Sequence, residues 1–125
     1  MIIKRLLQLN IVVSAIVAVC FIFVPAASLS LYGIAGDAAL HTIAQYFGTA
    51  HVAFAVLVWL ALRLDDARCL RTIVVSFFLG DLTGSAVLLV AQVRGTMNTM
   101  GWALVGLSLL FAIGYGYGAL RKLPQ

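Results

Sequence analysis

The sequence predicts an all-α membrane protein, a bundle of four antiparallel transmembrane helices. Hydrophobic residues make up 64% of its 125 residues and charged residues 10%, whereas soluble domains are roughly 45 to 50% apolar and about 25% charged. The apolar residues form four runs, each close to the roughly 20 residues that a helix needs to cross the hydrocarbon core. We expect a single integral membrane domain over 1–125, with spans at residues 6–24, 38–62, 71–93 and 100–120.

The distribution of Lys and Arg predicts the orientation of these spans. Connections between four spans alternate sides, which leaves Arg94 on one side and seven of the eight basic residues on the other. Because cytoplasmic connections carry the excess of Lys and Arg, both termini are expected in the cytoplasm. The basic residues stand singly or in pairs beside span ends, which favours lipid head groups over nucleic acid as their partners. The seven are Lys4, Arg5, Arg63, Arg68, Arg71, Arg121 and Lys122.

The first span leads into an outer connection, residues 25–36, that is too apolar for a solvated loop. We expect it to lie along the membrane interface or to tuck into the bundle. Asn10 and Ser14, one helical turn apart in the first span, are expected to bond a neighbouring helix. Cys20 near the outer surface and Cys69 near the cytoplasm are separated by most of the bilayer, so both are predicted to be free thiols.

Helix caps and short connections mark the remaining spans. Asp37 is predicted to cap the second span, because its carboxylate can accept from free amides of the first turn. The short hairpin between Arg63 and Arg71 predicts that the second and third spans are antiparallel neighbours. Asn98 or Thr99 is expected to cap the fourth span.

Glycines at helical spacing predict close helix packing. Gly114 and Gly118 form a GxxxG pair in the fourth span, and Gly48 and Gly84 are small residues on the second and third. Glycines four residues apart let another helix approach closely. The sequence leaves open whether that helix belongs to the same chain or to another subunit.

The residue that most needs an explanation is Asp81. Counting from Arg71 at 1.5 Å per residue places it roughly 15 Å deep, near the middle of the bilayer. A carboxylate there costs roughly 2.5 to 3.5 kcal/mol, so it must face protein or water. Ser85 and Gln92 fall on the same helical face and extend a polar stripe toward the outer end.

His51, on the second span, is predicted to lie at a depth similar to that of Asp81, about 18 Å from Arg63. One interpretation is a buried pair, in which the carboxylate orients the imidazole or shares a proton with it. The other is structural, with Asp81 protonated and bonded to a backbone carbonyl or to Thr83.

Gln45 and Gln92 leave a second pair of alternatives open. They could line an outward-opening pocket above His51 and Asp81, or bond each other across the helix interface. The inner halves of the two spans are almost entirely apolar, which favours a dead-end pocket over a channel. Phe77 and Phe78, one turn from Asp81, could hold a quinone ring, although core filling is the more common role of such rings.

A family resemblance agrees with the predicted topology. It is carried by PAASLSLYG at residues 25–33, by residues 48–63 ending in WLALR, and by GTMNTMGWALVG at residues 95–106. These stretches resemble a group of small bacterial four-helix inner-membrane proteins of unassigned function, distantly similar to the DoxX-like families. The resemblance implies a four-span bundle in a bacterial inner membrane, and it carries over no catalytic residue.

We therefore expect a protein without enzymatic activity and without a cofactor or metal. The first hypothesis is an accessory or scaffolding subunit that packs through its glycine faces, as a homo-oligomer or in a larger membrane complex. The second is a binder or transporter of a small molecule or of protons that uses an intramembrane polar site. The third is a redox-associated subunit that binds a quinone or another lipid. The residues of the polar site are His51, Asp81, Gln45, Ser85 and Gln92.

Overall fold

The computed structural model describes residues 2–64 and 66–120, and helices are the only regular secondary structure among these residues. The prediction of an all-α fold is therefore confirmed. Arg121 and Lys122, which contribute to the predicted orientation, lie outside the described residues. In chain order the helices are α1 (Ile2–Phe23), α2 (Pro25–Leu31), α3 (Ala38–Leu64), α4 (Ala67–Val93) and α5 (Gly101–Leu120).

Four helices of the described chain, α1, α3, α4 and α5, are long and apolar enough to cross a membrane, as in a polytopic membrane protein. Two of them start earlier than the apolar runs indicate. α1 begins at Ile2 and α4 at Ala67, about one helical turn before the expected starts at residues 6 and 71. The difference arises because hydropathy marks the hydrocarbon core, whereas a helix can continue through the interface while its Lys and Arg side chains reach toward water.

Two glycines end their helices by adopting a left-handed backbone conformation. Gly33 follows α2 with φ 76°, and Gly95 follows α4 with φ 71°. After α2, the Gly33 amide donates to Ser30 O and the Ile34 amide to Leu29 O, the pairing of a Schellman motif. A side chain at either glycine would strain the backbone, so each helix stops at a defined residue.

The predicted N-cap of α3 is confirmed. The Leu40 amide donates to Asp37 Oδ1 at 2.9 Å, and the His41 amide donates to Asp37 O at 3.0 Å. Asp66 caps α4 in a similar way, accepting from the Arg68 amide at 2.8 Å. Both carboxylates also lie at helix N-termini, where negative charge is stabilised by the helix dipole.

Asn98 joins the two connections at the end of the molecule that carries α2. Its amide donates to Tyr32 O at 2.8 Å, and its Nδ2 donates to Leu31 O at 3.0 Å. Its Oδ1 accepts from the Met100 amide at 2.9 Å, so of the two predicted caps before α5 it is Asn98 that forms this bond. The short helix α2 is therefore tied to the turn between α4 and α5.

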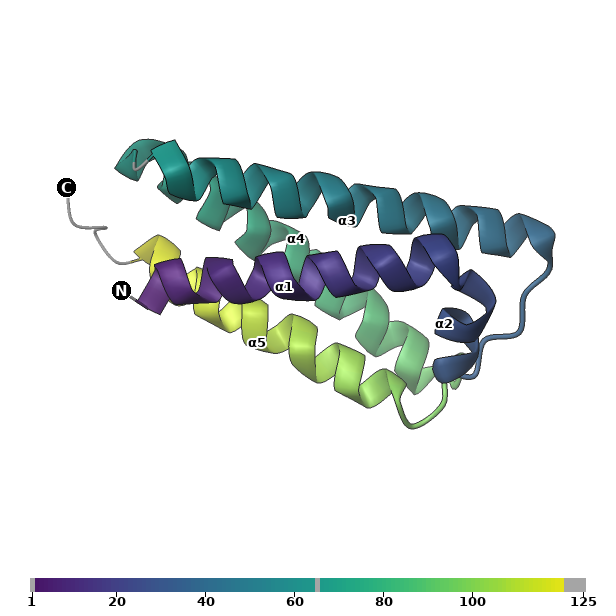
Figure 1. The fold of residues 1–125 in the computed structure, drawn as a ribbon. Coiled ribbons are helices and arrows are strands. Elements are labelled where there is room, and N and C mark those ends of the chain that lie inside the picture. Colours follow the sequence, from purple (N-terminus) through teal and green to yellow (C-terminus); the bar gives the residue numbers. More distant parts are fainter. Residues whose placement is uncertain (1, 65, 121–125) are drawn as a thin grey trace.

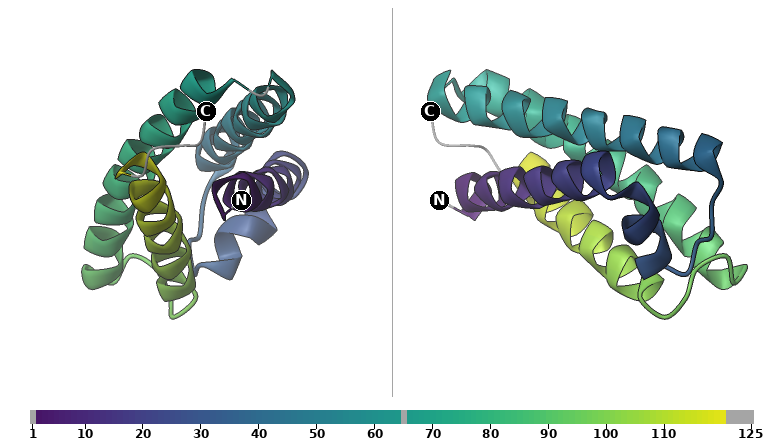
Figure 2. Two further views of the ribbon diagram at one scale, coloured as in Figure 1. Left: turned by 90° about the vertical axis from the view of Figure 1, so that its left-hand side faces the viewer. Right: turned by 45° about the vertical axis from the view of Figure 1, so that its right-hand side comes forward.

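The long helices associate as two pairs, α1 with α3 and α4 with α5 (Figure 1). α1 begins and α5 ends at the same end of the molecule, and the two pairs are inclined to each other (Figure 2). They approach at that end and diverge toward the end that carries α2. α3 touches α4 only sparsely, so the close neighbour relation predicted for the spans on either side of the short hairpin is not formed along their length.

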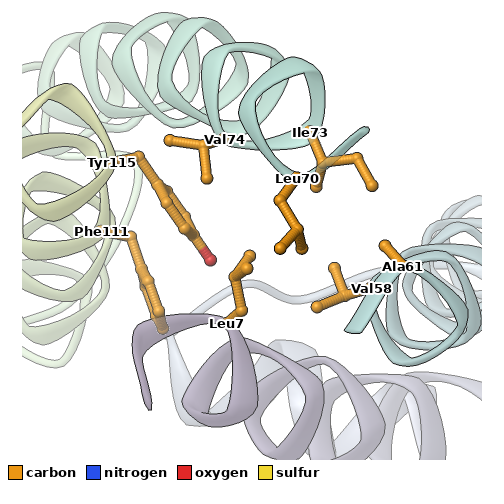
Figure 3. Packing of buried hydrophobic residues seen from close by; sticks show 8 residues of the cluster. All are labelled: Leu7, Val58, Ala61, Leu70, Ile73, Val74, Phe111 and Tyr115. Carbon is orange, nitrogen blue, oxygen red and sulfur yellow. The ribbon is translucent and has the colours of Figure 1, made fainter. Parts of the chain in front are cut away.

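The shared hydrophobic core is concentrated where the two pairs approach each other. Tyr115 projects from α5 into this core with its hydroxyl directed toward Leu7 of α1 (Figure 3). Because Tyr115 and Leu7 are fully buried, this end of the bundle is closed by tight apolar packing. The cluster consists of Leu7, Val58, Ala61, Leu70, Ile73, Val74, Phe111 and Tyr115.

Candidate functional site

The glycines predicted to pack helices lie against other helices of the same chain. A Cβ atom at Gly48 of α3 would meet Ala18 O of α1 at 3.2 Å and Ile22 Cγ1 at 2.9 Å. A Cβ atom at Gly114 of α5 would meet Leu6 of α1 at 2.7 Å. A Cβ atom at Gly118 of α5 would collide with Ile3 of α1.

Gly84 of α4 is less tightly packed. A Cβ atom there would lie 3.9 Å from Ser108 Oγ of α5, an ordinary contact. The predicted glycine contacts of α3, α4 and α5 are thus made within the chain.

Asp81 lies on the face of α4 that turns toward α5. On this face Ser85 is buried, and Asp81 and Gly84 are half-buried. The Ser85 hydroxyl lies 2.6 Å from the main-chain oxygen of Asp81 and 2.8 Å from Ser108 Oγ of α5. Ser108 Oγ in turn lies 3.2 Å from the same carbonyl. Two hydroxyls therefore satisfy the backbone of Asp81 without engaging its carboxyl group.

The carboxyl group of Asp81 retains an unused acceptor. Its Oδ2 atom is buried and has no hydrogen-bond partner. The predicted alternative bond to Thr83 is absent, because the Thr83 hydroxyl donates to Leu79 O and Gly80 O within its own helix. A buried acceptor without a partner is uncommon in folded proteins and calls for a physical explanation.

Tyr115 supplies a second unpaired polar group close by. The residue is fully buried, and its hydroxyl has no hydrogen-bond partner. Asn10 of α1 lies beside this hydroxyl without the geometry of a hydrogen bond, and Asp81 is close enough to interact with Tyr115 electrostatically. The Asn10 side chain accepts instead from Ser14 Oγ at 3.2 Å, within its own helix rather than across to a neighbour as predicted.

Aromatic rings form one wall of this polar region. Phe77, one turn from Asp81 on α4, stacks on Tyr115 with ring centroids 5.6 Å apart, and Tyr115 stacks on Phe111 at 5.8 Å. Phe54 of α3 meets the Phe77 ring edge-on at 5.7 Å. These contacts link α3, α4 and α5 through a continuous series of rings.

His51 does not bond to Asp81 in the described structure. Its Nδ1 lies 3.1 Å from Phe47 O in the preceding turn of α3, and its ring packs between Phe47 and Phe54. The ring contacts lead from His51 through Phe54 and Phe77 before they reach Tyr115. The structure therefore associates His51 with an aromatic face of α3 and not with the carboxyl group.

The two glutamines stabilise helix ends and do not bond each other. Gln45 is exposed, and its Nε2 donates to Ile22 O of α1 at 2.9 Å. Gln92 is buried, and its Nε2 donates to Asn98 O at 3.1 Å. The Oε1 atom of Gln92 has no partner and is packed against Gly101. Neither amide joins the polar groups around Asp81.

The site assembled by the structure therefore differs from the predicted one. It retains Asp81 and Ser85, and it adds Asn10, Tyr115 and Ser108 from α1 and α5. We call these five residues the Asp81 cluster. Ser108 carried a usable signal, since it is the only Ser, Thr, Asn or Gln between residues 101 and 120.

The chemistry available to the Asp81 cluster is proton binding, hydrogen bonding and charge recognition. Within residues 2–64 and 66–120, no group of three His, Cys, Asp or Glu side chains is placed to hold a metal ion. The oxygen atoms of the Asp81 cluster offer hydrogen-bond acceptors and hydroxyl donors next to aromatic rings. Polar groups of this kind in an apolar surrounding can fix the orientation of a small ligand.

In comparisons with known proteins, no protein-family model matches the chain, and neither a curated protein nor a solved structure shows significant similarity to it.

Proposed function

We propose that this chain is an integral protein of the bacterial inner membrane that binds a small ligand or a proton at Asp81, without catalysing a reaction. Four helices long and apolar enough to span the bilayer support the membrane location. The bias of seven basic residues to one side supports cytoplasmic termini. With this orientation, Asp81 lies near the middle of the bilayer and the end that carries α2 faces outward.

One observation carries the proposal: Asp81 Oδ2 and the Tyr115 hydroxyl, two buried groups that interact electrostatically, both lack hydrogen-bond partners. A buried donor or acceptor left unsatisfied costs about 1 to 3 kcal/mol. Inside a membrane, ionisable residues of this kind commonly mark proton or substrate sites. A ligand or proton that pairs with these groups would recover part of that cost.

The test is the reactivity of Asp81 with dicyclohexylcarbodiimide, a membrane-soluble reagent that modifies protonated carboxyl groups. The purified protein in lipid nanodiscs is treated with the reagent, and each Asp is followed by mass spectrometry. We expect modification at Asp81, whereas the exposed Asp66 should react faster with a water-soluble carbodiimide. An Asp81 that reacts only after the protein is unfolded would overturn the proposal, because a ligand could not reach it either.

Asp81→Asn separates binding from structural support. Because Oδ2 has no partner, the amide should change the free energy of unfolding by less than about 1 kcal/mol. A larger loss, measured by unfolding in mixed detergent micelles, would indicate that the carboxyl group mainly holds the helices together.

An accessory or scaffolding role is the second candidate, and two outward glycines favour it. Gly80 of α4 and Gly106 of α5 are exposed, and a Cβ atom at either would meet nothing within 4 Å. A helix of another subunit could approach closely at such positions. If the protein is an oligomer or part of a complex, Gly80→Leu or Gly106→Leu should lower the mass of the assembly extracted in mild detergent. An unchanged mass would argue against these docking positions.

A further inference from the structure

The Asp81 carboxyl group has no positive partner among the described residues. The nearest basic residues along α4 are Arg71 and Arg94, ten and thirteen positions away. At 1.5 Å per residue these lie roughly 15 and 20 Å along the helix, toward opposite surfaces of the membrane. His51, the titratable group of α3 at similar depth, bonds its own backbone. A carboxylate in this position therefore lacks the counter-charge that intramembrane acids normally find.

The surroundings of Asp81 are aromatic. Phe77 lies one turn away on the same helix, and it is stacked with Tyr115 and touched by Phe54. Aromatic rings attract cations through their electron-rich faces, and this attraction is strongest when water is excluded. A carboxylate next to such rings is complementary to a cation that is itself large and weakly hydrated.

The arrangement of the helices indicates from which side such a ligand would come. α3 and α4 contact each other only sparsely, and the two helix pairs diverge away from the shared core (Figure 2). Phe54 of α3 is 41% exposed and Asp81 is half-buried, so part of this region is not covered by the chain itself. Because that surface faces the bilayer, a ligand would approach from the lipid phase.

We propose that Asp81 and the rings of Phe77 and Phe54 bind a lipophilic organic monocation that enters from the bilayer. This inference rests on the proposed function of Asp81 as a ligand site and adds the chemical class of the ligand. The carboxylate supplies the opposite charge, and the rings contact the apolar body of the cation. An uncharged ring compound such as a quinone would use the aromatic wall but leave the carboxylate without a counter-charge.

The experiment uses two ions of nearly the same shape and opposite charge, tetraphenylphosphonium and tetraphenylborate. The full-length protein in nanodiscs is incubated with each ion and then with dicyclohexylcarbodiimide, and a neutral quinone, decylubiquinone, serves as a third probe. At ten times its Kd the cation should slow the modification of Asp81 about tenfold, because about one site in ten stays free. The anion and the quinone should leave the rate nearly unchanged.

Direct binding to variants provides the second readout. Equilibrium dialysis of labelled tetraphenylphosphonium should show saturable binding to the native protein, corrected for empty nanodiscs. Asp81→Asn should abolish this binding and Asp81→Glu should retain it. Asp37→Asn, which changes a carboxylate in the outer connection, is the matched control and should bind normally. Size-exclusion chromatography serves as the control that each variant remains folded.

The outcomes distinguish a failure of this inference from a failure of the proposed function. If Asp81 is modified but the cation gives no protection, or if the anion or the quinone protects equally, the ligand class is wrong and the proposed function stands. If Asp81 cannot be modified in the folded protein and no probe binds, both proposals fail. Binding of the cation that survives Asp81→Asn would place the cation elsewhere and overturn this inference.

Discussion

At the scale of single residues, Tyr115 shows that a side chain can be well packed and still incompletely satisfied. Its ring is stacked on both Phe77 and Phe111, and the residue is fully buried. Its hydroxyl nevertheless has no hydrogen-bond partner. The ring thus stabilises the apolar core, whereas the unpaired hydroxyl lowers the free energy of unfolding.

Tyr115→Phe should therefore raise the free energy of unfolding of the ligand-free protein by about 1 kcal/mol, because it removes an unpaired buried polar group. The same change should leave cation binding at Asp81 nearly unchanged, because the buried Tyr115 hydroxyl makes no hydrogen bond to the carboxyl group. Thermal unfolding in detergent and equilibrium dialysis measure the two effects. Tyr46→Phe, on a residue that is 78% exposed, should change neither. A destabilised Tyr115→Phe protein would mean that the hydroxyl is bonded after all.

Sequence reasoning predicted the residue-scale features that depend on local geometry. The capping carboxylate of Asp37 binds amides of its own first turn, so its role follows from chain position alone. The pairing of His51 with Asp81 depended instead on the rotation of two helices about their axes. Depth can be counted along a helix, but the residue spacing of 100° means that a small rotation changes which side chains meet. In the structure His51 faces Phe47 and Phe54.

At the scale of helices, α1 and α3 pack closely because small residues separate their backbones. Ala18, Ala44 and Gly48 are buried in the described bundle, and a Cβ atom at Gly48 would lie 3.2 Å from the backbone oxygen of Ala18. Membrane helices gain little from apolar burial alone, so close approach between small residues is a main source of their association. The most intimate contact of α3 is thus with α1, and not with the helix that follows it in the chain.

Gly48→Ala should destabilise the protein by about 1 to 3 kcal/mol, because the added methyl group presses on a backbone atom that cannot move aside. Unfolding in mixed micelles measures the change. Gly106→Ala is the matched control: nothing lies within 4 Å of its Cβ position, and alanine favours the helix, so the variant should be as stable as the native protein or more stable. Equal effects of the two substitutions would contradict the packing of α1 on α3.

Asn98 connects helices at the end of the bundle that carries α2. It bonds the end of α2, the Met100 amide directly before α5 and, through its carbonyl, Gln92 of α4. Asn98→Ala should leave the carbonyl of Leu31 and the amide of Met100 without their side-chain partner, which costs about 1 to 3 kcal/mol if water does not replace them.

Hydrogen exchange tests this role of Asn98. Asn98→Ala should speed amide exchange in residues 31–34 and 98–101 and leave the shared core slow. Thr99→Ala should leave exchange unchanged, because the exposed Thr99 side chain makes no hydrogen bond in the described structure. If exchange in residues 31–34 does not change on Asn98→Ala, α2 is held by other contacts.

The existence of the spans was predictable because a stretch of about 20 apolar residues has few alternatives to a helix in lipid. Which helices pack against each other was not predictable, since a short connection brings helix ends together without fixing the angle between the helices. The hairpin between α3 and α4 shows this, as the two helices separate beyond it (Figure 1). Ser108 and Tyr115 joined the Asp81 cluster for the same reason: their positions depend on how α5 packs on α4.

At the scale of the whole molecule, the two ends of the bundle differ in how closely their helices pack. Large apolar side chains from all four long helices fill the end where α1 begins and α5 ends. Tyr115 of the Asp81 cluster belongs to this core, and the helix pairs diverge toward the other end of the molecule (Figure 1). The shared apolar core thus lies chiefly at one end of the bundle, and it includes the unpaired hydroxyl of Tyr115.

The central claim is that α4 crosses the bilayer and carries Asp81 into its interior. The most direct measurement is the labelling of single cysteines at the two ends of α4 by a membrane-impermeant maleimide, in a protein with Cys20→Ser and Cys69→Ser. Arg68→Cys and Thr96→Cys are both at exposed positions. In intact cells Thr96→Cys should be labelled and Arg68→Cys should not, with the reverse in inverted vesicles. Labelling of both from the same side would contradict the account, because α4 would then not span the membrane and Asp81 would not lie within it.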